Sequence, residues 1–271
     1  MIKMKKNNFI YTGIMYFLIF VLIFPLIILL IWSVTNNWPW PRIFPDSFGL
    51  RGYRYIFSFS NKVIKVLLFS VWLSSVVTLI TLIISIPAAK ALGVYNFKGK
   101  KFIKILVLAP IIVPPLTVVM GIHVAFIKLR LANTFWGVVL VHLIPCLPYG
   151  IRILTDVFEI IGESMEMQAR VLGARPMQVF FRITLPLITP GLISAGSLIF
   201  IVSFSQYFLT FLIGGGRIVT FSMLLFPYIQ SGDRMMASAF SVVFIFTVLI
   251  VLLSVEKVVK IYYKTENHFY L

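Results

Sequence analysis

The stretch that decides the fold is Glu163–Pro190, ESMEMQARVLGARPMQVFFRITLPLITP, which is flanked on both sides by apolar runs long enough to cross a bilayer. Apolar residues recur at helical spacing within residues 160–172, and this spacing predicts a short helix. Gly173 is expected to end it, because glycine accepts the left-handed backbone common at helix C-termini. Pro176 suits the first turn of a second short helix, where its missing N–H is no loss. The stretch therefore predicts a helix–glycine–helix elbow between two membrane spans.

Composition places the whole chain in a membrane. Of its 271 residues 60% are hydrophobic and 12% are charged, and the mean hydropathy is +1.02. Soluble domains are about 45–50% apolar and about 25% charged. A net charge of +16 on a soluble protein would suggest a nucleic acid partner. Here anionic lipid and the positive-inside rule explain the charge, and we find no nucleic-acid-binding motif.

Six apolar runs have the length of about 20 residues that a membrane-spanning helix needs. They cover about 9–34, 63–92, 102–127, 134–157, 187–213 and 237–259. Six spans place both termini on one side. Fifteen of the 24 basic residues fall in segments assigned to the inside and nine in segments assigned to the outside, so the positive-inside rule predicts cytoplasmic termini. The predicted fold is an all-α membrane protein, with residues 1–271 as a single transmembrane domain.

Two stretches depart from plain helical spans. Residues 42–65 hold five of the nine outer basic residues together with prolines and aromatic residues. This composition predicts a folded segment on the outer membrane surface, which is either a docking surface or an aromatic belt. Prolines kink membrane helices, and Pro110–Pro115 predicts a real break in the run 102–127. Such a break suits either a moving core or simple helix packing.

The elbow resembles the EAA loop of ABC-importer permeases, whose pattern is E-A-A-x-x-x-G, then about nine residues, then I-x-L-P. Five residues match it in order and spacing: Ala169, Gly173, Ile183, Leu185 and Pro186. Met167 and Gln168 stand where the family has its glutamate and first alanine. Glu166 lies one residue earlier and Glu163 one turn earlier, so either carboxylate is a candidate for the missing glutamate.

On these residues the chain resembles the permease subunit of a type I ABC importer. The resemblance implies a MetI-like permease fold of six transmembrane helices, with a cytoplasmic coupling helix in the 160–186 loop between spans 4 and 5. It assigns ATPase coupling to Glu163, Glu166, Met167, Ala169, Arg170, Leu172, Gly173, Ala174, Arg175 and Pro176. Gly173 would set the bend. Packing into a cleft of the ATPase would fall to Ala169, Leu172 and Ala174. Polar contacts at the rim of that cleft would come from Arg170, Arg175 and Glu166.

The resemblance also implies the partners. They are two copies of an ABC ATPase, a second permease subunit that is a paralogue, an external solute-binding protein and the lipid bilayer of a bacterial inner membrane. The chain contains no G-x-x-x-x-G-K-[ST] motif, and the glycines at 214–216 precede an arginine and predict a turn. We therefore expect no enzymatic activity and no cofactor in this chain; ATP and Mg²⁺ would bind to the partner ATPase.

A polar cluster in the run 187–213 is the candidate substrate pathway, and it consists of Ser203, Ser205, Gln206 and Tyr207. Polar side chains in a span face the bundle interior, where they contact a passing solute or join helices by hydrogen bonds; the two interpretations carry equal weight. Polyamine, thiamine, iron and phosphonate permeases have the most similar layout. Polyamine permeases often carry acids where Ser205 and Gln206 stand, so a polyamine is one option among several small solutes.

Other classes of membrane protein need chemistry that the sequence does not place in a span. A stand-alone secondary carrier or channel is the alternative, but ion-coupled carriers usually hold ionisable groups deep in the bilayer, and none of the eight acids falls mid-span. A membrane-embedded enzyme needs a catalytic cluster. His123 and His142 lie in spans with no acid nearby in sequence, and they predict packing or a helix–helix hydrogen bond rather than a metal site. Cys146 is expected to be a small packing residue.

Overall fold

The computed structural model describes residues 7–39, 41–113 and 115–264, and most of them are helical. The chain divides into two compact units, residues 1–64 with 224–247 and residues 65–223 with 248–271. Among the described residues, five helices are long and apolar enough to cross a membrane: Tyr11–Ser33, Val63–Val94, Phe135–Ile161, Pro176–Phe204 and Arg234–Val259. The predicted basic N-terminus at Lys3, Lys5 and Lys6 lies outside the described residues, as do Glu266 and His268.

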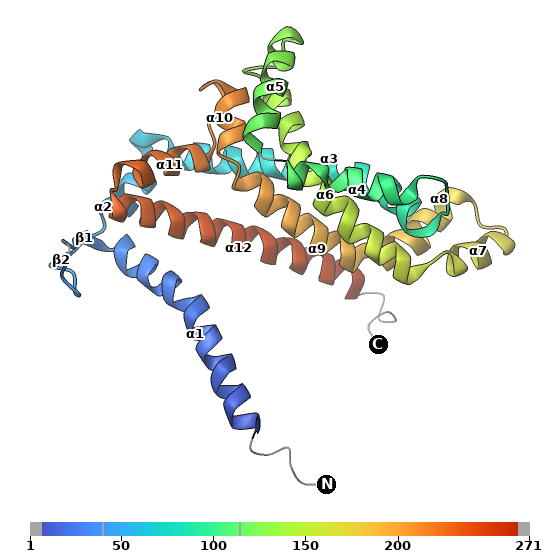
Figure 1. Ribbon diagram of the computed structural model, residues 1–271, viewed down its shortest axis with the longest axis horizontal. Helices are drawn as coiled ribbons and strands as arrows, with labels where there is room; N and C mark the ends of the chain where they lie inside the picture. Colours follow the sequence, from blue (N-terminus) through green and yellow to red (C-terminus); the bar gives the residue numbers. More distant parts are fainter. Residues whose placement is uncertain (1–6, 40, 114, 265–271) are drawn as a thin grey trace. The chain divides into compact units, whose positions relative to one another are not determined.

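The first unit begins with a long apolar helix and continues into a folded loop (Figure 1). Its elements are α1 (Asn7–Ser33), β1 (Thr35–Asn37), β2 (Ser47–Phe48), α2 (Arg51–Phe57), η1 (Phe59–Asn61), most of α11 (Phe221–Ser231) and the first half of α12 (Arg234–Lys264). The two short strands pair antiparallel, with Thr35 opposite Phe48. The predicted folded segment at 42–65 is thus present; its place at a membrane surface stays a prediction.

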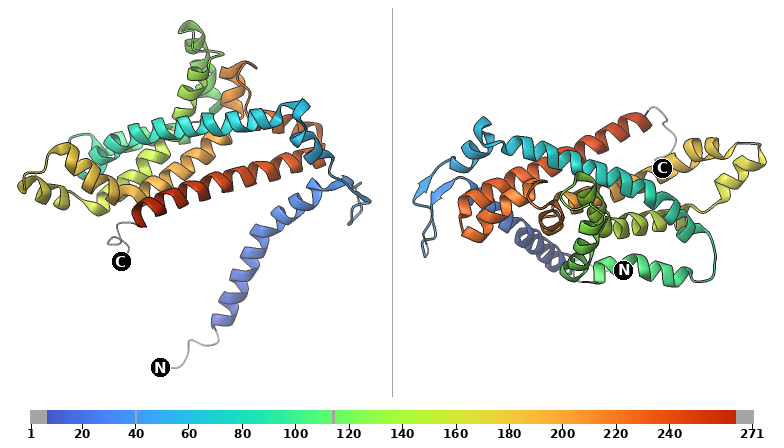
Figure 2. Two further views of the ribbon diagram at one scale, coloured as in Figure 1. Left: turned by 180° about the vertical axis from the view of Figure 1, so that it is seen from behind. Right: turned by 90° about the horizontal axis from the view of Figure 1, so that it is seen from above.

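The second unit holds the remaining helices. Its elements are α3 (Val63–Val94, from Lys65), α4 (Lys100–Ile112), α5 (Pro115–Lys128), α6 (Phe135–Ile161), α7 (Ser164–Val171), α8 (Pro176–Val179), η2 (Phe180–Thr184), α9 (Leu185–Phe204) and α10 (Phe208–Gly214), together with the end of α12. Figures 1 and 2 show α6 and α9 side by side, with α10 against α5 and α6. The buried core lies mainly between α3, α6 and α9, and includes Leu73, Val139, Leu154, Ile188 and Ile199.

Two of the six predicted spans are interrupted. In the run 102–127, α4 ends at Ile112 and α5 begins at Pro115, which confirms the predicted break at Pro110–Pro115. Val113 has an extended backbone, as expected for a residue that precedes a proline. In the run 187–213, α9 ends at Phe204 and α10 begins at Phe208. Five of the six predicted spans thus correspond to a helix long and apolar enough to cross a membrane among the described residues, and the count of six spans stays a prediction.

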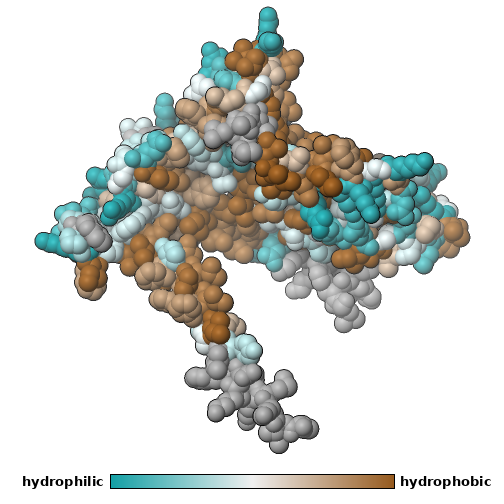
Figure 3. Space-filling view, in the orientation of Figure 1, coloured by the Kyte–Doolittle hydropathy of each residue, from teal (hydrophilic) through white to brown (hydrophobic). Residues whose placement is uncertain are grey.

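The surface of the second unit has an apolar part and a hydrophilic part. Its long helices carry hydrophobic side chains, and hydrophilic side chains gather toward α7 and α8 (Figure 3). These two short helices lie at the end of the α6–α9 pair remote from α10 (Figure 1). A hydrophilic end on an apolar bundle is what a loop outside a bilayer requires, because unpaired polar groups are costly in lipid.

Candidate functional site

The predicted elbow is present, with different bounds. Ile160 and Ile161 belong to α6, which ends because Gly162 has a φ of 66°, so α7 begins at Ser164 rather than at 160. Gly173, with a φ of 87°, follows α7 as predicted, and Pro176 opens α8. The second helix is not short, because residues 176–204 form one apolar helical stretch. A π-helical turn at 180–184 lies directly before Pro186 and widens the helix where the proline ring would otherwise clash.

The elbow presents most of its candidate coupling residues to solvent. Met167, Arg170, Leu172, Gly173, Arg175 and Pro176 are exposed, and Glu163, Ala169 and Ala174 are half-buried. The tip is apolar, since Val171 and Leu172 are 88% and 87% exposed. Exposed large apolar side chains on an otherwise hydrophilic loop indicate a protein-binding surface.

Glu166 is the exception, because it is buried and does not lie on the expected rim. Its carboxylate oxygens accept hydrogen bonds of 2.8 and 2.6 Å from Nζ of Lys90 in α3. Oγ1 of Thr184 in η2 donates to Oε1 at 2.7 Å, and Arg170 lies 3.6 Å away. Partial burial alone would raise the pKa of Glu166, but the hydrogen bonds from Lys90 and Thr184 and the nearby positive charges outweigh it and lower that pKa.

Sequence reasoning did not find the partners of Glu166. Lys90 was one of many basic residues on the predicted inner side, and it lies 76 positions from Glu166. Thr184 lies inside the elbow motif but carries no signal of its own. Between the two candidates for the family glutamate, Glu166 is the one held by partners; Glu163 has no ion pair among the described residues.

The interrupted fifth span is held together by a buried histidine. Nδ1 of His142 in α6 lies 3.0 Å from Oγ of Ser203 at the end of α9. Nε2 lies 2.8 Å from Oγ1 of Thr210 in α10. All three side chains are buried. A neutral imidazole donates from one nitrogen and accepts at the other, so it matches two hydroxyl groups. The predicted helix–helix hydrogen bond of His142 is thereby confirmed.

The three other pathway candidates lie in the link between α9 and α10. Ser205 is exposed and donates to the carbonyl of Val202, while Gln206 and Tyr207 are half-buried. The Tyr207 ring stacks on Phe211 with centroids 5.7 Å apart. Non-helical backbone at this depth in a span is tolerated where protein or a water-filled cavity surrounds it. Of the four pathway candidates, Ser203 thus lies in the core against His142 and the other three lie in the link.

Comparison with known proteins decides the family. Residues 82–264 match the family model described as "Binding-protein-dependent transport system inner membrane component". The chain belongs to this family. The matched region includes the whole elbow, the interrupted fifth span and Lys90.

Relatives of this permease component support the assignment. It is 25% identical over 92% of its length to the putative 2-aminoethylphosphonate transport system permease protein PhnV of Salmonella typhimurium, which is matched over 94% of its length. It is 30% identical over 65% of its length to the arabinooligosaccharides transport system permease protein AraQ of Halalkalibacterium halodurans. It is also 30% identical over 62% of its length to the probable ABC transporter permease protein YurM of Bacillus subtilis. The last two matches span 64% and 52% of those relatives.

A solved structure shares the fold of the permease component. The crystal structure of a bacterial ABC transporter involved in the import of the acidic polysaccharide alginate contains a chain with a TM-score of 0.65 and 18% identity. The match covers 95% of this chain and 99% of that one. This likeness supports the predicted permease fold.

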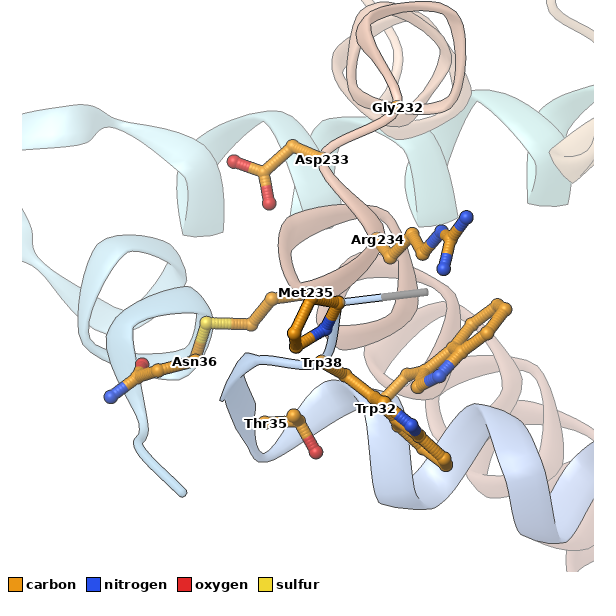
Figure 4. Close-up of a pocket in the computed structure, with 9 residues that line it drawn as sticks. Trp32, Thr35, Asn36, Trp38, Gly232, Asp233, Arg234 and Met235 are labelled. Atoms are coloured by element: carbon orange, nitrogen blue, oxygen red, sulfur yellow. The ribbon is translucent and has the colours of Figure 1, made fainter. Parts of the chain in front are cut away.

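The first unit of the permease component contains an open pocket of about 380 Å³ (Figure 4). Trp32 and Trp38 form part of its wall, with their rings edge to face. The guanidinium of Arg234 lies over the Trp32 ring, 5.2 Å from its centroid. Asp233 points away from Arg234 in Figure 4 and forms an ion pair with Arg51. These contacts join the end of α1, the residue after β1, α2 and the start of α12 within the first unit.

Proposed function

We propose that this permease component forms part of the translocation pathway of an ATP-driven importer and is moved by a separate ATPase through α7, Gly173 and α8. Family membership supports the transport role. The exposed apolar tip at Val171 and Leu172 carries the coupling role, because it gives a cytoplasmic partner a surface outside the spans. The alternative of a stand-alone carrier or channel has no supporting observation.

The partners follow from this role. We propose two copies of the ATPase, which bind ATP and Mg²⁺, and a second permease subunit that is a paralogue of this chain. A solute-binding protein would deliver the solute from the outside. The permease component would lie in a bacterial inner membrane with both termini in the cytoplasm, so that the elbow faces the ATPase.

The solute would pass the link between α9 and α10. Ser205, Gln206 and Tyr207 lie at this break, and its backbone groups are not all used within a helix. Named solutes of the relatives are 2-aminoethylphosphonate and arabinooligosaccharides. Both are polar, and the phosphonate relative is matched along nearly its whole length. A polar solute, with phosphonates among the options, would find hydrogen-bonding partners in the side chains of the link.

The coupling role is tested by photo-crosslinking. A benzoylphenylalanine residue at Leu172 is expected to capture a protein with a nucleotide-binding P-loop, identified by mass spectrometry. The matched control is the same residue at Leu79, which is 61% exposed in the middle of α3. Capture of no ATPase at Leu172, or labelling of the elbow by an impermeant reagent added outside the cell, would contradict the proposal.

The folded segment of the first unit is the proposed contact for the binding protein. Phe44, Phe48, Phe57 and Phe59 are all well exposed on it. Exposed aromatic residues are enriched at protein interfaces. A photo-crosslinker at Phe59 is expected to capture a secreted solute-binding protein, and a crosslinker at Leu172 is expected not to. The reverse pattern would invert the proposed topology.

A further inference from the structure

The first helix of the elbow, α7, is connected to the rest of the second unit by a glycine at each end. Its backbone is joined to α6 through Gly162 and to α8 through Gly173, both with positive φ. No atom lies within 4 Å of the position that a Cβ would take at either glycine. Both joints therefore bend without striking a neighbour. These joints also hold the orientation of α7 only weakly, because glycine restricts the backbone less than any other residue does.

Side chains of α7 provide almost no other attachment. The structure describes every residue of α7, and Glu166 is its one buried residue. Met165 and Met167 on either side of Glu166 are exposed, as is Val171. Most short helices on a protein surface are held by an apolar face. In α7, the carboxylate of Glu166 provides the attachment that an apolar face would otherwise provide.

This carboxylate joins three elements at once. Lys90 lies near the end of α3, and Thr184 closes η2 directly before α9. The side chains of Lys90 and Glu166 are 22% and 9% exposed, so water screens their interaction only in part. Hydrogen bonds between charged groups are shorter and stronger than neutral ones, and Lys90 reaches both oxygens of Glu166.

We propose that Glu166 is a positioning residue that transmits displacement of α7 to α3 through Lys90 and to α9 through Thr184. The inference rests on the proposed coupling of the elbow to an ATPase. A push on the apolar tip bends the two glycine joints, so the backbone absorbs the motion. The anchor of Glu166, Lys90 and Thr184 does not bend in this way, and it moves the two long helices with α7.

Other ion pairs of the second unit lack this geometry. Arg170 approaches Glu166 from within α7 and transmits nothing between elements. Lys104 and Glu159 pair between α4 and α6 and do not touch α7. Glu159→Gln is therefore a matched control for Glu166→Gln. Both changes remove one negative charge from an ion pair between two helices of the same unit.

The experiment uses the complete complex and needs no knowledge of the solute. A reporter cysteine replaces half-buried Gln206 after the cysteine of this chain is removed by Cys146→Ala. The rate of its modification by an impermeant methanethiosulfonate is measured without nucleotide and with ATP and vanadate. With Glu166 intact, we expect nucleotide to change the rate at least about fivefold, the lower end of typical allosteric couplings.

Glu166→Gln is expected to reduce this nucleotide response to less than about twofold, while the ATPase still co-purifies. Glu159→Gln should keep the full response. The exchanged pair Lys90→Glu with Glu166→Lys should restore part of it, because the attraction between the two positions returns. A full response in Glu166→Gln would overturn the proposal. Loss of the ATPase from that variant would also overturn it, since the residue would then serve assembly alone.

Failure of the proposed function has a different signature. If the complex with native Glu166 binds no ATPase and shows no nucleotide response, the proposed coupling role of the elbow is wrong. The proposal for Glu166 is then wrong as well, because it rests on that role. If the native complex responds and Glu166→Gln responds equally, only the anchor is wrong.

Discussion

Two of the breaks between helices of the second unit, the elbow and the interrupted span, are secured with different chemistry. At the elbow, Glu166 forms an ion pair with Lys90 and accepts a hydrogen bond from Thr184. At the interrupted span, His142 binds Ser203 and Thr210 through neutral groups in the buried core. His142 bonds to α9 and α10 on the two sides of their break, whereas Glu166 joins its own helix α7 to η2 beyond Gly173 and to α3.

The difference follows from the surroundings. Inside a bilayer an ionised side chain is costly, so a break there needs donors and acceptors without net charge. Outside the bilayer an ion pair such as that of Lys90 and Glu166 is tolerated. The buried seam, formed by His142, Ser203 and Thr210, is suited to holding α6, α9 and α10 in a fixed arrangement. The charged anchor suits the proposed role of Glu166, because it ties α7 to α3 and η2 where an ion pair is tolerated.

The largest effect is expected at the buried seam. His142→Ala removes both hydrogen bonds, leaves Ser203 without its partner and opens a cavity. We expect a loss of about 2–5 kcal/mol in unfolding free energy, measured by thermal unfolding of the purified permease component in detergent. His142→Gln should recover part of it. The control is His123→Ala, since half-buried His123 has no hydrogen bond among the described residues. Equal losses in the two alanine variants would remove the distinction between the seam and ordinary packing.

The next effect is expected at the elbow hinge. Gly173→Val forces a β-branched residue into a φ of 87°, which costs about 1–3 kcal/mol. Nothing stands near the position of its Cβ, so the strain is confined to the backbone. We expect normal amounts in the membrane and loss of the nucleotide response at Gln206. Gly173→Asn should be milder, because asparagine tolerates the left-handed region. A full response in Gly173→Val would show that the bend is not needed.

A smaller effect is expected on acidification. The pKa of Glu166 is lowered in the folded protein, so its stabilisation is complete above the ordinary glutamate pKa of about 4.3. It is lost as the pH falls through the lowered value, because the protonated acid no longer attracts Lys90. The difference in thermal midpoint between the native chain and Glu166→Gln should be constant from pH 7 to about pH 4.3 and should then shrink. A difference that shrinks near pH 6 would contradict the ion pair.

The smallest effect is expected from Arg170. It lies one helical turn from Glu166 at 3.6 Å, and its side chain is 57% exposed. Exposed pairs of this kind contribute about 0–1 kcal/mol. Arg170→Ala should therefore leave both the thermal midpoint and the nucleotide response nearly unchanged. A loss as large as that of Glu166→Gln would mean that the anchor includes the arginine.

Local sequence signals located several of these features. Gly173 and Pro176 punctuate the chain strongly, and they lie where the elbow bends. Pro110–Pro115 breaks its run as predicted. The same logic missed Gly162, which lacks a proline beside it; α6 runs past the predicted end at 157 and stops at Ile161. It also missed the break at 205–207, where neither glycine nor proline occurs.

The sequence by itself determined the class of this protein: apolar runs require a membrane, and the glycine and proline spacing of the elbow identifies the transport family. Both are properties of neighbouring residues, which are read directly along the chain. Only the tertiary structure decided that Glu166 binds Lys90, 76 positions away, and that His142 bridges the two halves of a broken span. These pairings arise from helix packing, which brings together residues that carry no mutual signal in sequence.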